Sequence, residues 1–121
     1  MTSHEYIVAC QRSKSALFNL NRSRADLLHA AMGMCTESAE FADALKKHIF
    51  YDKKLDETNL KEELGDILWY MAIACANLGV SFEELMLTNV KKLEARYHKT
   101  FTPEEAEKRN LEIERDILEN Y

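Results

Sequence analysis

Apolar residues recur at helical spacing along most of this chain, and polar clusters between them mark where helices end. The pattern predicts five helices, over about residues 3–20, 25–48, 56–77, 81–97 and a short stretch from 102. The tail over 108–121 is expected to be either a polar amphipathic helix or partly disordered. Asp56 has the side chain of an N-cap, and Ser81-Phe-Glu-Glu84 forms a capping box. Gly79 is expected to end the third helix, and Pro103 suits the first position of the fifth.

Composition supports an all-α fold. A single proline and three glycines leave few breaks, while Leu, Ala, Glu and Lys are plentiful. At 121 residues the chain has the length of one domain, 1–121, with a motif-bearing core over about 25–101 and a tail over about 102–121. The three cysteines are an odd number without CxxC spacing, so we expect free, buried thiols.

Charge and hydropathy limit the kinds of partner that the protein can bind and the cell compartment in which it is expected. The net charge of −5 argues against a polynucleotide partner, because phosphate backbones select basic surfaces. No apolar run reaches the roughly 18 residues that a membrane span needs. The N-terminus lacks the basic-then-apolar pattern of a signal peptide. We therefore expect a cytoplasmic protein with no membrane partner.

The segment 67–78 is apolar nearly all round, unlike a surface helix of a small bundle, which keeps one polar face. Such a helix needs cover on several sides. The pattern therefore favours a homo-oligomer, most simply a dimer, with a tetramer also open. The alternative is a monomer in which the first and fifth helices supply the cover.

Two pairs of acids stand out within apolar helices: Glu37-Ser-Ala-Glu40 and Glu63-Leu-Gly-Asp66. Their i, i+3 spacing puts each pair on one helix face, and the connection between the helices is short enough to make them antiparallel neighbours. Acids in apolar surroundings are costly to bury unless they are paired or metal-bound. The alternative is that both pairs are ordinary surface spacings on charged helices.

Four converging carboxylates need a compensating cation. All-oxygen ligands favour a hard ion, Mg²⁺ first and Mn²⁺ next, and Mg²⁺ keeps positions open for water and substrate phosphates. A di-iron bundle would need Glu-x-x-His motifs, and no histidine of this chain has a glutamate three residues before it. The spacing therefore indicates a magnesium site that acts on a phosphate-bearing substrate.

Cationic side chains could complete such a site. Asn89, Lys92 and Arg96 share one helix face, and the two cations could neutralise phosphate oxygens. Lys47, near the linker lysines Lys53 and Lys54, could also reach a phosphate chain. The alternative is that all of these residues are solvated surface charges.

Several motifs occur together in one order along the chain: Leu27-Leu-His-Ala-Ala-Met-Gly-Met34, Glu37-Ser-Ala-Glu40, Lys46-Lys-His48, Glu62-Glu-Leu-Gly-Asp66 and Asn89-Val-Lys-Lys-Leu-Glu-Ala-Arg-Tyr97. This combination resembles the MazG-like all-α nucleoside triphosphate pyrophosphohydrolases over about residues 25–101. The resemblance implies an oligomeric, four-helix-bundle-like core with a short extra C-terminal helix. It also implies Mg²⁺-dependent cleavage of a nucleoside triphosphate between the α and β phosphates, giving the monophosphate and pyrophosphate.

The resemblance further assigns roles to residues. It implies that metal ligation and catalysis fall to Glu37, Glu40, Glu63 and Asp66, and substrate binding to Asn89, Lys92, Arg96 and Tyr97. Some family members have an extra acid, tied to water activation, where this chain has Thr36. Water activation would then fall to Glu37, Glu40 or Glu62. Base recognition would come from residues such as Phe18, Trp69 or Tyr70, although the two on the third helix are also ordinary core or interface residues.

Two other functions are compatible with these motifs. One is a related pyrophosphohydrolase that acts on phosphoribosyl-ATP or on alarmone nucleotides. The other is a non-catalytic helical oligomerisation module that keeps the acids for structural reasons. Comparison of substrates separates the first from the expected activity, and metal binding separates the second.

Overall fold

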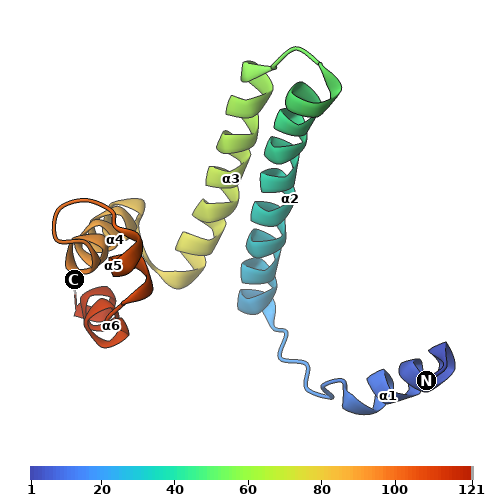
Figure 1. Ribbon diagram of the computed structural model, residues 1–121. Helices are drawn as coiled ribbons and strands as arrows, with labels where there is room; N and C mark the ends of the chain where they lie inside the picture. The colour runs from blue at the N-terminus through green and yellow to red at the C-terminus, as the bar shows by residue number, and fades with distance from the viewer. Residues whose placement is uncertain (121) are drawn as a thin grey trace.

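The structure is a computed structural model that describes residues 1–120, and the described residues form six α-helices and no strands (Figure 1). The helices are α1 (Ser3–Ser13), α2 (Arg22–Tyr51), α3 (Glu57–Leu78), α4 (Phe82–Arg96), α5 (Pro103–Glu107) and α6 (Leu111–Asn120). The prediction of an all-α fold is therefore confirmed. Tyr121, the last residue of the predicted tail, lies outside the described residues.

The long helices α2 and α3 form an antiparallel hairpin and lie side by side along most of their length (Figure 1). Asp56 begins α3 as predicted, because its side chain accepts a hydrogen bond from the backbone N–H of Asn59 at 3.0 Å. Gly79 ends α3 in the left-handed conformation, with φ 66°. At the open end of the hairpin, the Asn77 side chain donates to the backbone carbonyl of Ser23 at 2.9 Å.

Gly33 allows the two helices to approach closely. A Cβ atom at this position would lie 2.2 Å from the ring of Tyr70 on α3, so no larger residue fits without displacing the ring. The Tyr70 ring also meets His29 edge to face, with the centroids 5.6 Å apart. This contact favours one register of α2 against α3.

A second unit packs beyond the C-terminal end of α3 (Figure 1). The axes of α3 and α4 are bent by 93° at the break between them. α4 begins with the predicted capping box of Ser81 and Glu84, and α5 begins with Thr102 as N-cap and Pro103 in its first turn. α6 packs against α4. The predicted tail was either an amphipathic helix or partly disordered, and the structure shows a helix, α6, over most of it.

The first helix is shorter than predicted: it ends at Ser13, and not near residue 20. The Ser13 hydroxyl donates to the backbone carbonyl of Ala9 at 3.0 Å, and Ser15 accepts from the backbone N–H of Leu17. Such local side-chain bonds offer the backbone an alternative to helix. Residues 14–21 are therefore not helical, and they separate α1 from the hairpin (Figure 1).

α2 is longer than predicted at both ends. It begins at Arg22, where Asn21 is the N-cap, and it runs to Tyr51, three residues beyond the predicted end at His48. Asp52 ends it in the left-handed conformation, with φ 52°, a role that aspartate tolerates better than most residues. The loop between α2 and α3 therefore covers only residues 52–56.

The single chain buries few large apolar side chains. Among the described residues no large side chain is fully buried, and Leu68 and Trp69 of α3 are 54% and 58% exposed. Neither α1 nor α5 packs extensively against α3 in the described part of the chain. The four-helix core is therefore not formed within one chain. Of the three thiols expected to be buried, Cys75 is buried, whereas Cys10 and Cys35 are exposed.

None of the described helices alone has both the length and the hydropathy to cross a bilayer. Only α3 and α4 taken together meet the requirement, and that pair is sharply bent.

Candidate metal centre

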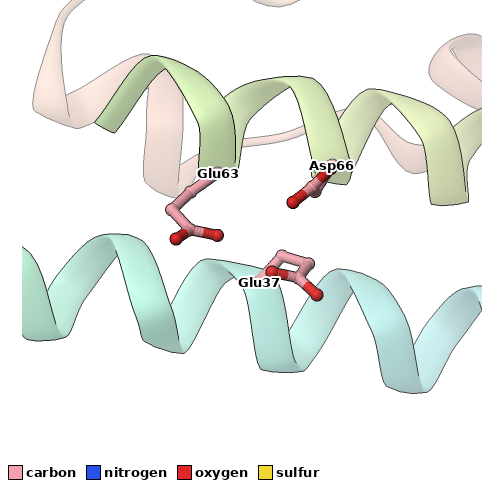
Figure 2. A group of neighbouring side chains, drawn as sticks. All are labelled: Glu37, Glu63 and Asp66. Carbon is pink, nitrogen blue, oxygen red and sulfur yellow. The ribbon is translucent and has the colours of Figure 1, made fainter. Parts of the chain in front are cut away.

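Three of the four predicted acids meet between the hairpin helices. Glu37 on α2 faces Glu63 and Asp66 on α3, and each residue offers a carboxylate oxygen within 4.8 Å of the others (Figure 2). Glu63 is 8% exposed, Glu37 is half-buried and Asp66 is exposed. The group therefore has a buried side against the hairpin and an open side that a ligand could reach.

The close approach at Gly33 explains this convergence. Glu37 lies four residues after Gly33 on α2, and Tyr70 lies four residues after Asp66 on α3. Residues four apart lie on the same face of a helix, so the Gly33–Tyr70 contact and the acids share one seam. Because the helices are antiparallel, the seam brings Glu37 opposite Asp66 and Glu63 (Figure 2).

The electrostatics of the group favour a cation. Burial raises the pKa of Glu63 above its usual value, and the neighbouring Glu37 raises it further. Glu62 and Glu40 add smaller effects of the same sign. The described residues contribute only carboxylates to the group, and carboxylate oxygens are the ligands that Mg²⁺ and Mn²⁺ prefer. Glu37, Glu63 and Asp66 thus fit a hard divalent cation.

Glu40, the fourth predicted acid, does not belong to this group of three. It lines a neighbouring pocket of about 300 Å³ whose other charged residues include Lys47, Lys53 and Lys54. Lys47 pairs with Asp43 there, with 2.7 Å between Nζ and Oδ2. The structure therefore places lysines and the fourth acid side by side, one turn along α2 from the carboxylate cluster.

The predicted substrate-binding residues of α4 lie in other surroundings. Arg96 forms a bidentate ion pair with Glu114 of α6, from Nε to Oε1 at 2.8 Å and from Nη2 to Oε2 at 3.0 Å. Tyr97 is the C-cap of α4, and the Arg96 guanidinium lies 5.7 Å from the centre of its ring. Asn89 is exposed beside an apolar pocket between α3, α4 and α6, and Lys92 is half-buried.

The hairpin geometry separates the α4 residues from the acids of the same chain. At 1.5 Å per residue, Asp66 lies about 18 Å before the end of α3, and Arg96 lies about 21 Å beyond the start of α4. The 93° bend between the two helices prevents them from folding back on each other. No α4 residue lines the pocket beside the acids.

The aromatic residues considered for base recognition differ in their positions. Tyr70 lies between α2 and α3, in contact with His29 and close to Gly33, whereas Trp69 and Phe18 are largely exposed. Sequence reasoning missed the Gly33–Tyr70 contact and the ion pair of Glu114. The first could have been found from a glycine four residues before a motif acid, but no local pattern links Glu114 to an arginine 18 residues earlier.

Comparison with known proteins places these features in a family. Residues 26–101 match the MazG nucleotide pyrophosphohydrolase domain, and this range includes the acids and the α4 motif. The Gene 37 protein of Mycobacterium phage L5 is 33% identical over 75 residues. That alignment covers 58% of this chain and 65% of the relative, slightly less than two thirds of the relative's length. No solved structure matches the chain. Because the domain match covers more than half of the sequence, this chain belongs to the MazG nucleotide pyrophosphohydrolase domain family.

Proposed function

We propose that the protein is a Mg²⁺-dependent nucleoside triphosphate pyrophosphohydrolase that clears surplus or modified nucleotides from the cytoplasmic pool. It cleaves a ribo- or deoxyribonucleoside triphosphate between the α and β phosphates and releases the monophosphate and pyrophosphate. The convergence of Glu37, Glu63 and Asp66 within 4.8 Å carries the proposal, because a cluster of carboxylates with one open side suits a divalent cation that binds phosphates. Family membership supports the reaction class.

The residues of the hairpin would have two roles, to hold the metal ion and to orient the attacking water. Glu37, Glu63 and Asp66 hold the cation, which when bound neutralises phosphate oxygens and lowers the pKa of water. Glu40 lies beside the cluster and serves either as a further ligand or as the acid that orients the attacking water. Lys47 and its neighbouring lysines line the adjoining pocket, where they can receive the departing pyrophosphate.

A second copy of the chain would complete the site. Within one chain, the 93° bend after α3 directs the end of α4, with Arg96 and Tyr97, away from the acids of α3. The exposed apolar surface of α3 suits a homodimer or homotetramer in which hairpins pair into a four-helix core. We propose that the α4 residues of one chain contact the phosphates held at the acids of its partner.

Pyrophosphate release tests the function. The protein is incubated with Mg²⁺ and a panel of common and modified nucleoside triphosphates, phosphoribosyl-ATP and alarmone nucleotides, and pyrophosphate and orthophosphate are measured separately. We expect pyrophosphate from at least one triphosphate, and the ranking of rates separates the related activities. Orthophosphate alone, or no product from any substrate, would refute the proposal.

Substitutions connect the activity to the acids. Glu63→Gln should abolish Mg²⁺ binding in isothermal titration and reduce turnover by about a hundredfold or more while the circular dichroism spectrum is kept. Glu57→Gln, an exposed acid on the same helix, is the control and should behave like the wild type. Glu40→Gln separates its two roles: retained Mg²⁺ binding with lost turnover indicates water orientation. If the wild type binds neither Mg²⁺ nor Mn²⁺, the non-catalytic module is the better description.

A further inference from the structure

Glu114 is the least exposed charged residue in the described part of the chain, at 4%. It lies on α6, beyond the residues that match the family. Both of its carboxylate oxygens accept from Arg96, and both also accept from Arg109, from Nε at 3.3 Å and from Nη2 at 2.5 Å. A segment outside the family match therefore supplies the partner of a motif arginine.

The pairing restrains the Arg96 side chain in a defined way. An arginine has five N–H donors in a planar fork, and Glu114 takes one from Nε and one from Nη2. The two bonds fix the plane of the guanidinium, and Nη1 lies outside this pair. An unrestrained arginine would instead lose rotamer freedom on binding a ligand, at a cost in affinity.

The Glu114 carboxylate does not by itself cancel the positive charge at Arg96. It is shared between Arg96 and Arg109, so these three residues together carry one positive charge. Lys108 lines the pocket beside Arg96 together with Glu104 and Glu105. The Arg96 side chain is 14% exposed, so part of it can still be reached from outside. A bidentate carboxylate on one edge and a phosphate on the other is a geometry that guanidinium groups support.

We infer that Glu114 is a positioning residue: it holds the guanidinium of Arg96 in the orientation that contacts a substrate phosphate. The inference rests on the proposed function, in which Arg96 binds phosphate. It assigns to α6 a part in substrate binding that the family motifs do not contain. The opposite possibility is that Glu114 competes with phosphate for Arg96, so that α6 inhibits the enzyme.

The test uses a probe that needs no turnover. Binding of inorganic pyrophosphate in the presence of Mg²⁺ is measured by isothermal titration for the full-length wild type, Glu114→Gln and the control Glu112→Gln, an exposed acid on the same helix. We expect Glu114→Gln to weaken pyrophosphate binding by about tenfold or more, because a misplaced binding group loses much of its effect, and to raise KM for the triphosphate by a similar factor. Glu112→Gln should change neither.

A double-substitution cycle separates positioning from a general effect on folding. Arg96→Lys keeps the charge but lacks the Nε–Nη2 fork, so adding Glu114→Gln to it should weaken binding little further. Additive losses, or a loss in Glu114→Gln that is matched by loss of helical circular dichroism, would show that Glu114 acts only through the stability of α6 and would overturn the inference.

The remaining outcomes distinguish the inference from the proposed function. If the wild type hydrolyses triphosphates but Glu114→Gln binds pyrophosphate like the control, the inference fails and the function stands. If the wild type binds pyrophosphate but hydrolyses nothing, the function fails, and the effect of Glu114→Gln still decides the inference. Tighter binding by Glu114→Gln would show competition. If the wild type neither binds pyrophosphate nor hydrolyses a triphosphate, both the inference and the proposed function are refuted, and if it hydrolyses without measurable pyrophosphate binding, the change in KM decides the inference.

Discussion

At the scale of single residues, Gly33 influences how closely α2 and α3 approach each other. It has no chemistry of its own, yet it admits the Tyr70 ring against the backbone of α2. That contact favours the register that brings Glu37 opposite the acids of α3. Gly65, which lies within the second acidic motif, has nothing within 4 Å of a Cβ added to it. Substitution of these two helical glycines by alanine should therefore change the stability of the protein in opposite directions.

Gly33→Ala should destabilise the protein by about 2 kcal/mol, because overpacking forces the ring or the backbone to move. Gly65→Ala should instead stabilise the helix by about 1 kcal/mol, since alanine has the better helix propensity and meets no neighbour in the chain. Urea unfolding of the two variants beside the wild type measures both effects. Equal stability of Gly33→Ala and the wild type would contradict the assigned contact.

At the scale of helices, side-chain caps made the starts of α3, α4 and α5 predictable. Asp56, Ser81 and Thr102 cap α3, α4 and α5 as the sequence indicates, because each cap bonds a backbone N–H only three residues away. The end of α1 was missed because serine side chains there bond the backbone locally. α2 extends to Tyr51 and ends at Asp52, which adopts a left-handed conformation. The presence of an aspartate in the sequence does not by itself predict that conformation.

The candidate site was predictable to a similar degree. Acid spacing on neighbouring helices indicated the cluster, and three of its four members meet. The position of Glu40 depends on helix rotation of a few tens of degrees, which spacing alone does not define. The separation of the α4 residues from the acids depends on the bend after α3, and the partner of Arg96 comes from a distant helix. Both are tertiary features without a local signal.

The attachment of α6 to α4 should depend on pH. Hydrogen bonds from Arg96 and then from Arg109 lower the pKa of Glu114 from 4.5 to about 2. Because the folded-state pKa is the lower one, the stabilisation is fully present above about pH 4.5 and is lost as the pH falls toward 2. Its full size is about 3 kcal/mol for a carboxylate as buried as this one.

Urea unfolding at pH 7 and near pH 2 measures this contribution. Glu114→Gln should be less stable than the wild type at pH 7, and the difference should shrink at the lower pH. Comparison with the variant removes the effect of the other carboxylates, which titrate in both proteins. A difference that is unchanged between the two pH values would contradict the assigned ion pair.

At the scale of the whole molecule, a single chain leaves much of its apolar surface exposed to solvent. The exposed apolar side chains of α3 need cover, and α1 and α5 do not supply it. We expect sedimentation velocity at micromolar concentration to show a dimer or a larger assembly. Leu68→Glu should weaken the assembly on the order of a hundredfold, because a buried charge in an interface is costly.

Leu111→Glu is the control for that experiment, since Leu111 is at least as exposed but lies at the start of α6. It should leave the assembly intact. A monomeric wild type would refute the oligomer, and equal effects of the two variants would extend the interface to α6.

The ion pair of Arg96 has a consequence for how the protein can be divided. The family resemblance ends at residue 101, so a shortened protein cut there would keep all four acids and the α4 motif. It would lose Glu114, however, and with it the two hydrogen bonds that orient the Arg96 guanidinium. The segment that matches the family is therefore shorter than the segment that contains the ion pair of Arg96. If Glu114 positions Arg96 as proposed, a catalytic assay on the shorter piece would underestimate the activity of the longer chain.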